Sequence, residues 1–326
     1  MAIQPTPEYF DLLNMAVARE IQVSIQYMLQ HTKMEKLIRK VIPENILVDK
    51  TTYDAVGKFL KEFAIVEMKH AADIMERIYY LGGSATTKAD KITIGKNLSE
   101  FAKLGAKAEE EALILYRKII KTAKEVGDRT TRQMFQKIYK EEEEHLFKFQ
   151  EYANIKDEPE ETETTQVSAW RNIFTDDYFA LLNKAVAAEI SAIIQYTNQH
   201  EKAALLALRE KKTPLEVVQE TNKAKVVSDL LKSIFLVEME HLEKITERIY
   251  LLEGEATTEP EPIPQVGNTA DDFLKLDHEA ENIALVLYRK IIEEASKRGD
   301  SVTRRLFEDI VSQEEEHYWT FDDYLR

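Results

Sequence analysis

Apolar residues recur every three or four positions along most of the chain, and this spacing predicts long amphipathic helices. Glycines interrupt the pattern at matching places in the two halves, which marks the helix ends. Each half therefore predicts four helices. In the first half they cover about residues 6–40, 53–81, 97–126 and the segment after 128; in the second they begin near 175, 223, 269 and 300.

The connections predict how these helices are arranged. Gly127-Asp128 and Gly299-Asp300 form tight turns, so the third and fourth helices are antiparallel. About 14 residues join the second helix to the third, and a chain of that length reaches up to about 46 Å. The second and third helices can then be parallel, which predicts an all-α fold of two four-helix bundles, each with one long crossover. Between the first two helices we expect a loop with a short helical extension, at residues 43–52 and 211–221.

The two halves repeat each other. The run from Leu115 to Ile120 recurs as Leu287 to Ile292, about 170 residues later. A chain of 326 residues also exceeds the usual size of one hydrophobic core. We therefore expect two domains joined as a covalent pseudo-dimer, at residues 1–155 and 170–326, with an acidic linker at 156–169.

The composition limits the partners and the chemistry. With a formal net charge of −15, most of the surface should repel nucleic acid and anionic lipid, whereas metal cations fit better. Cysteine is absent, so thiolate catalysis and iron–sulfur clusters are excluded, and a metal must be held by oxygen and nitrogen. Because no stretch can span a bilayer and no signal pattern begins the chain, we expect a cytoplasmic protein without membrane or nucleic-acid partners.

Four short strings carry most of the candidate chemistry. Each reads Glu-x-x-His within a predicted helix, and positions i and i+3 share one face, so a carboxylate and an imidazole lie side by side. One isolated copy is more often a solvated surface pair, but four copies use four of only seven histidines. They also fall on apolar helix faces, where an unpaired carboxylate is costly. The strings are Glu67 with His70, Glu142 with His145, Glu238 with His241, and Glu314 with His317.

One further glutamate interrupts the apolar face of each remaining helix. These residues are Glu20 and Glu109 in the first half, and Glu189 and Glu281 in the second. Two helices that give one Glu and two that give Glu-x-x-His supply the ligands typical of di-iron and di-manganese carboxylate proteins. We therefore expect one dinuclear metal site in each half, with iron, manganese or a mixed pair of ions.

On these motifs both halves resemble bacterioferritin and its ferritin-like relatives. The resemblance lies in Glu20 followed by Gln26-Tyr27, the run Glu67 to Ala71, and Glu109 followed by Tyr116-Arg117, with the same motifs in the second half. It implies that Glu67 and Glu142 bridge two irons, as do Glu238 and Glu314. The terminal pairs that it implies are Glu20 with His70, Glu109 with His145, Glu189 with His241, and Glu281 with His317.

The chain departs from this family in ways that argue against a hollow cage. It continues from His317 only to Arg326, so we expect no fifth helix, and two bundles are fused. Rubrerythrin is the poorer match, because its extra glutamate after the third-helix ligand is replaced by Ala112 and Ala284. We expect a monomeric pseudo-dimer or a small homo-oligomer.

Three further pairs of residues receive candidate roles. Met68 and Met239 lie where bacterioferritin ligates haem between subunits; they could hold one haem, or only fill an apolar interface. Tyr27 and Tyr196 could donate a hydrogen bond to a ligating carboxylate or supply an electron, with core packing as the alternative. The candidate acceptors for the ligating imidazoles, Glu141 and Gln313, differ between the halves, which would make the two sites unequal.

These features predict two dinuclear iron centres that oxidise Fe²⁺ with O₂ or H₂O₂, as a ferroxidase or a peroxide-reducing oxidoreductase. Without a cage, detoxification of oxygen species fits as well as storage. A second hypothesis is oxidation of an organic molecule by the same centres, which needs an apolar pocket leading to the metals. A third is non-enzymatic binding of zinc or manganese. The sequence does not identify the reductant.

Overall fold

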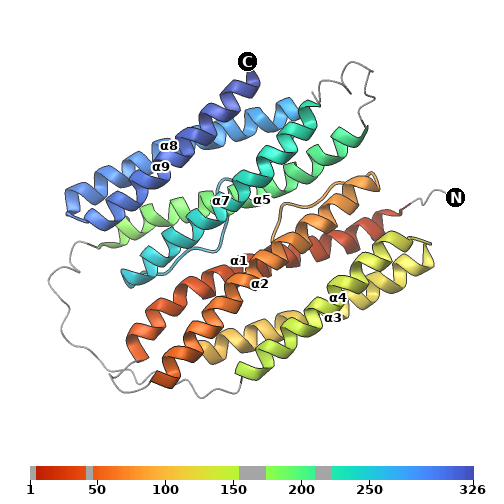
Figure 1. Ribbon diagram of the computed structural model, residues 1–326, viewed down its shortest axis with the longest axis horizontal. Helices are drawn as coiled ribbons and strands as arrows, with labels where there is room; N and C mark the ends of the chain where they lie inside the picture. Colours follow the sequence, from red (N-terminus) through yellow and green to blue (C-terminus); the bar gives the residue numbers. More distant parts are fainter. Residues whose placement is uncertain (1–4, 42–46, 154–173, 210–221) are drawn as a thin grey trace. The chain divides into compact units, whose positions relative to one another are not determined.

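Helices form all the regular secondary structure of the part that the structure describes (Figure 1), a computed structural model that describes residues 5–41, 47–153, 174–209 and 222–326. The chain divides into two compact units, Met1–Thr162 and Glu163–Arg326. Within the described ranges each unit contains four helices and no strand, which confirms the predicted all-α fold. The predicted linker at 156–169 lies outside the described residues, so the domain boundaries placed there stay a prediction.

The first unit contains α1 (Pro7–Val41), α2 (Leu47–Tyr80), α3 (Leu98–Glu125) and α4 (Arg129–Tyr152). Helix α1 packs against α2, α3 packs against α4, and α1 also contacts α3. The second helix begins at Leu47, earlier than the position near residue 53 that its apolar spacing predicts. This early start is the expected helical extension, whereas residues 42–46 lie outside the described ranges.

The second unit repeats this arrangement with α5 (Asp176–Arg209), α7 (Lys223–Leu251), α8 (Ala270–Arg298) and α9 (Ser301–Leu325). Its helix pairs correspond, with α5 against α7, α8 against α9, and α5 against α8. These bounds agree closely with the predicted starts near 175, 223, 269 and 300. The insertion expected at 211–221 falls outside the described residues.

A buried aspartate fixes the turn before the last helix of each unit. Asp128 caps α4 by accepting from the backbone N–H of Thr131, and it forms a 2.7 Å ion pair with Arg77 of α2. The hydroxyl of Tyr9 on α1 donates to the same carboxylate at 3.2 Å. This one residue therefore connects three helices of the first bundle. Asp300 makes the same contacts with Thr303, Arg248 and Tyr178 in the second bundle.

The long crossover of each unit runs along its first helix. The backbone N–H of Asp90 donates to the carbonyl of Ala18 at 3.0 Å, and Glu261 donates to Ala187 at 3.1 Å. Gln195 of α5 also accepts from the N–H of Gln265 at 2.9 Å. The crossover thus covers one side of the helix that carries Glu20 or Glu189. None of the described helices has the length and apolar content to cross a membrane.

Candidate metal centres

All six metal-binding side chains predicted in the first half meet in one buried cluster. They come from all four helices, and they form two groups of four whose ligand atoms lie within 4.8 Å of one another. Two carboxylates belong to both groups and the other four residues to one group each. The first group is Glu20, Glu67, His70 and Glu142; the second is Glu67, Glu109, Glu142 and His145.

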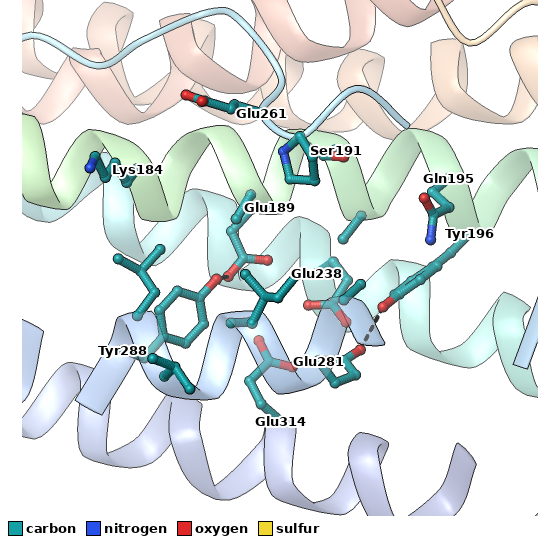
Figure 2. Close-up of a pocket in the computed structure, with 18 of the residues that line it drawn as sticks. Lys184, Glu189, Ser191, Gln195, Tyr196, Glu238, Glu261, Glu281, Tyr288 and Glu314 are labelled. Atoms are coloured by element: carbon teal, nitrogen blue, oxygen red, sulfur yellow. Dashed lines mark hydrogen bonds between the residues drawn. The ribbon is translucent and has the colours of Figure 1, made fainter. Parts of the chain in front are cut away.

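The second half brings its six predicted residues together in the same way, and Figure 2 shows the four carboxylates among them. The shared carboxylates are Glu238 and Glu314, at the positions of Glu67 and Glu142. The groups are Glu189, Glu238, His241 and Glu314, and Glu238, Glu281, Glu314 and His317. His317 is the most exposed of these side chains, with 12% of its surface accessible.

The residues present fit a pair of divalent iron ions. The donors are carboxylate oxygens and imidazole nitrogens without sulfur, a set that suits iron and manganese. Three of the shared oxygens, Oε1 of Glu67, Glu142 and Glu238, are sealed from solvent and make no well-directed hydrogen bond among the described residues. Each has an imidazole nitrogen 2.8–3.2 Å away. A buried carboxylate oxygen without a well-directed hydrogen bond is costly, and a bound cation between the shared carboxylates would reduce that cost.

The environment moves the pKa values of these groups in opposite directions. Burial, with the charges of Glu142 and Glu67 next, raises the pKa of Glu20 well above its ordinary value. Burial would also raise the pKa of Glu67, but His145 and His70 outweigh it and hold this pKa at about 2. Burial alone would lower the imidazole pKa values, yet the neighbouring carboxylates raise that of His70 to about 12 and that of His145 to about 10.

The second cluster shows the same distribution of protons. Burial raises the pKa values of Glu189 and Glu281, whereas contacts with His241 and His317 overcome burial and hold the pKa of Glu314 at about 2. Against the effect of burial, the carboxylates raise the pKa of His241 to about 12 and that of His317 to about 9. A metal ion that binds here must displace protons from the imidazoles and from the terminal carboxyl groups.

The two imidazole nitrogens of the second helix have separate partners. Nδ1 of His70 faces the cluster, 3.0 Å from Oε2 of Glu67, while Nε2 lies 2.9 Å from Oε2 of Glu141. In the second half Nε2 of His241 lies 3.0 Å from Oε1 of Gln313. These contacts confirm the predicted partners of both histidines. A carboxylate in one half and an amide in the other make the two clusters chemically different.

Four tyrosines hold the terminal carboxylates. Tyr27 donates to Oε1 of Glu109, and Tyr196 donates to Oε1 of Glu281 at 2.6 Å, which is one of the alternatives that the sequence offered for these two residues; their catalytic role stays a prediction. Sequence reasoning missed the other pair: Tyr116 donates to Oε1 of Glu20, and Tyr288 donates to Oε1 of Glu189 at 2.5 Å. Their position two turns after the third-helix glutamate was the available signal, but their acceptors lie on the first helix.

The remaining candidates lie outside the clusters. Met68 and Met239 are 1% and 5% exposed, and haem ligation by them stays a prediction. The other three histidines have different partners. Nδ1 of His31 and of His200 lies 2.7 Å from the carbonyl of Gly57 and of Ser228, and His278 stacks on Tyr318 at 4.2 Å between ring centroids.

Comparison with known proteins supports one family. The model of the ferritin-like domain matches residues 45–156 and 216–326, together more than half of the chain. The bacterioferritin of Desulfovibrio desulfuricans is 32% identical over 137 residues, which cover 42% of this chain and 69% of that protein. The bacterioferritin of Rhodobacter capsulatus is 26% identical over 125 residues, which cover 38% of this chain and 77% of that protein.

Solved structures of the same two bacterioferritins also match. The Desulfovibrio desulfuricans structure, described as showing its diiron site in different catalytic states, is 27% identical, covers 48% of this chain and 82% of its own, and has a TM-score of 0.39. The Rhodobacter capsulatus structure is described with a metal-free dinuclear site and haem iron. It is 25% identical, covers 46% of this chain and 86% of its own chain, and also has a TM-score of 0.39.

Proposed function

The chain belongs to the ferritin-like family, and we propose that each half holds two iron ions and oxidises Fe²⁺ with O₂ or H₂O₂. In the first half, the shared carboxylates Glu67 and Glu142 would bridge the ions. Glu20 and His70 would complete the ligand set of one ion, and Glu109 and His145 would complete that of the other. In the second half the bridges would be Glu238 and Glu314, with Glu189 and His241, and Glu281 and His317, as the terminal ligands.

The sharing of two carboxylates between two groups of four carries this proposal. A single ion in each half would leave an imidazole and a terminal carboxylate buried without a metal, and burying such groups without a partner is costly. Two ions bridged by the shared carboxylates use every donor of the cluster. The same geometry, repeated from four helices in each half, argues against a chance gathering of acidic residues.

The chain's own residues would position the metal ligands for this reaction. Two Fe²⁺ ions held by these residues would supply one electron each, enough to convert H₂O₂ and two protons into two waters, or O₂ and two protons into H₂O₂. Tyr27 and Tyr116 hold the terminal carboxylates Glu109 and Glu20 through their hydroxyl groups. Glu141 accepts from Nε2 of His70 and leaves Nδ1 aimed at the cluster. Orientation by such outer partners is worth roughly 10–100-fold in metal affinity or activity.

The proposal includes a cytoplasmic protein that acts as a single chain or a small homo-oligomer and does not store iron in a cage. The fusion of two bundles in one chain supports the absence of a cage. Ligation of haem by Met68 and Met239 is a separate part of the proposal, tested by the Soret band of the purified protein. Absence of that band in protein produced with added haem would assign the two thioethers to packing alone.

Elemental analysis of protein purified without chelators tests the metal assignment. We expect near four iron ions per chain, one for each of the four groups of ligand atoms. Glu67→Gln should remove the pair in the first half and leave about two ions, and Glu238→Gln should do the same in the second half. Zinc in place of iron, in a protein that oxidises no Fe²⁺, would instead support a structural role and contradict the proposal.

A further inference from the structure

A cavity of about 480 Å³ opens beside the candidate metal centre of the second half, between α5, α8 and the crossover (Figure 2). Four candidate ligands line it, and the stick view shows them facing the space between the two helices: Glu189, Glu238, Glu281 and Glu314. Most of the remaining wall is apolar and includes Ala188, Ala192 and Ile283. The volume lies within the range of roughly 300–1,000 Å³ that is usual for small-molecule sites.

The first half fills the corresponding space on its first helix. When the helices are matched at their ligands Glu20 and Glu189, Ala188 corresponds to Arg19. Ser191 and Ala192 correspond likewise to Gln22 and Val23. All three first-half residues have larger side chains, and all three are buried.

An ion pair closes the first half from the facing helix. Glu111 of α3 occupies the position that Ile283 has on α8. Nη1 of Arg19 reaches across from α1 to Oε2 of Glu111 at 3.3 Å. Ala112, the residue after Glu111, is 2% exposed, whereas the matching Ala284 lines the cavity and is half-buried. The route that is open in the second half is therefore occupied by a salt bridge in the first.

The rim of the cavity favours an anion. Lys184 and Lys290 are exposed there and have no ion-pair partner among the described residues, while Glu261 is the one exposed carboxylate that lines the cavity. The first half has Met15 in place of Lys184. The cavity is also long, because Lys184 and Tyr196 both line it and lie twelve residues apart on α5, about 18 Å at 1.5 Å per residue.

We propose that the second half binds an unbranched monocarboxylic acid in this cavity, with its carboxylate at Lys184 and Lys290 and its apolar chain directed toward the metal centre. The first half, sealed by Arg19 and Glu111, does not bind it. The two halves therefore differ in access: the first admits small oxidants and ions, and the second also admits an organic acid. This binding does not depend on the oxidation of iron.

Isothermal titration of the full-length, metal-free protein with decanoate, below the concentration at which decanoate aggregates, tests the proposal. We expect one equivalent to bind per chain. Hexanoate should bind at least ten-fold more weakly, because each buried methylene contributes roughly four-fold to affinity. Decylammonium, with the same chain and the opposite charge, should also bind more weakly. Two equivalents of decanoate, or none, would overturn the proposal.

Installing the ion pair of the first half gives the matched variant. Ala188→Arg with Ile283→Glu should abolish decanoate binding and leave the stoichiometry of metal binding unchanged, so failure of this proposal is separable from failure of the iron assignment. Arg19→Ala with Glu111→Ile alters the same pair in the first half and should leave the original equivalent of decanoate in place. The proposal would be overturned if both double variants lost decanoate binding equally, or if neither variant lost it.

A milder substitution covers the case in which the double variant does not fold. Lys184→Met, which copies the first half at an exposed position, should retain the helical circular dichroism of the parent protein. It should weaken decanoate binding about two- to five-fold, the usual effect of one exposed charge, and leave decylammonium binding undiminished. Unchanged decanoate affinity would contradict the assignment of the carboxylate to this end of the cavity.

Discussion

Nε2 of His70 lies 2.9 Å from Oε2 of Glu141. The matching imidazole in the second half meets the amide oxygen of Gln313 instead, at 3.0 Å. A carboxylate acceptor makes the imidazole more basic and a stronger ligand than an amide does, so the first half should bind metal more tightly. We predict two classes of site that differ by roughly 10–100-fold in affinity.

Reciprocal substitutions test this asymmetry. Glu141→Gln should lower the affinity of the first half toward that of the second, and Gln313→Glu should raise the second toward the first. Anaerobic Fe²⁺ titration followed calorimetrically would resolve the two classes. Identical Fe²⁺ affinities of the two halves in the unmodified protein would contradict this prediction.

Removing one tyrosine hydroxyl should weaken a single half. Tyr116→Phe keeps the ring but leaves Glu20 without its donor, so we expect roughly 10–100-fold weaker iron binding in the first half alone. Tyr288→Phe should act on the second half in the same way. Tyr324→Phe removes an exposed hydroxyl and serves as the control. A uniform loss in both halves from either buried substitution would show that the hydroxyl acts on overall stability.

Metal binding should release protons and strengthen as the pH rises. The imidazoles that would bind the ions have pKa values raised to between about 9 and about 12, so they carry protons at neutral pH that must leave before the nitrogens coordinate. We expect about one proton or more released per ion at pH 7. Calorimetric titration with Zn²⁺ in buffers of different ionisation enthalpy measures this number. A binding enthalpy independent of the buffer would contradict the expectation.

The Asp128–Arg77 pair should stabilise the first bundle except in acid. Burial would raise the pKa of Asp128, but the hydrogen bonds from Thr131 and the charge of Arg77 outweigh it and lower this pKa. The stabilisation is therefore complete above the unfolded-state value near 3.9, and it is lost as the pH falls through the lower folded-state pKa.

The substitution Asp128→Asn tests this role. It should cost about 3–5 kcal/mol of unfolding free energy at pH 7, because it leaves Arg77 buried without its partner. The variant should also lose less stability than the parent protein between pH 4 and pH 2. Asp73→Asn, at an exposed position on α2, should change the free energy by less than about 0.5 kcal/mol. A similar small change for Asp128→Asn would show that the pair contributes little.

The sequence predicted those parts of the site that lie on one helix. Glu67 and His70 share a face because they are three residues apart, and no knowledge of packing is needed to pair them. Contacts between side chains on different helices were harder to predict from the sequence. Tyr116 belongs to the motif that follows Glu109, but its acceptor Glu20 lies on another helix, and the contact depends on how α1 and α3 pack. The start of α2 at Leu47 lies within the helical extension expected at residues 43–52, although the regular apolar spacing begins only near residue 53.

The open cavity of the second half could not be predicted at all. It depends on the joint size of residues on two helices, such as Ala188 and Ile283, which lie far apart in the sequence. Single differences between the halves, such as Arg19 against Ala188, are visible in the sequence. Their effect appears only when Arg19 is seen to reach Glu111. An apolar route to the metals was named as the requirement for an organic substrate, and the structure contains a cavity of that kind in one half.

Stopped-flow absorbance after Fe²⁺ is added to the metal-free protein, with O₂ and separately with H₂O₂, tests whether each half oxidises Fe²⁺ at a dinuclear site. We predict a fast phase of Fe²⁺ oxidation whose amplitude saturates at four Fe²⁺ per chain, one for each group of ligand atoms. The amplitude should halve in Glu142→Gln and vanish when Glu314→Gln is added. Fe²⁺ oxidation no faster than in buffer with either oxidant would contradict the account.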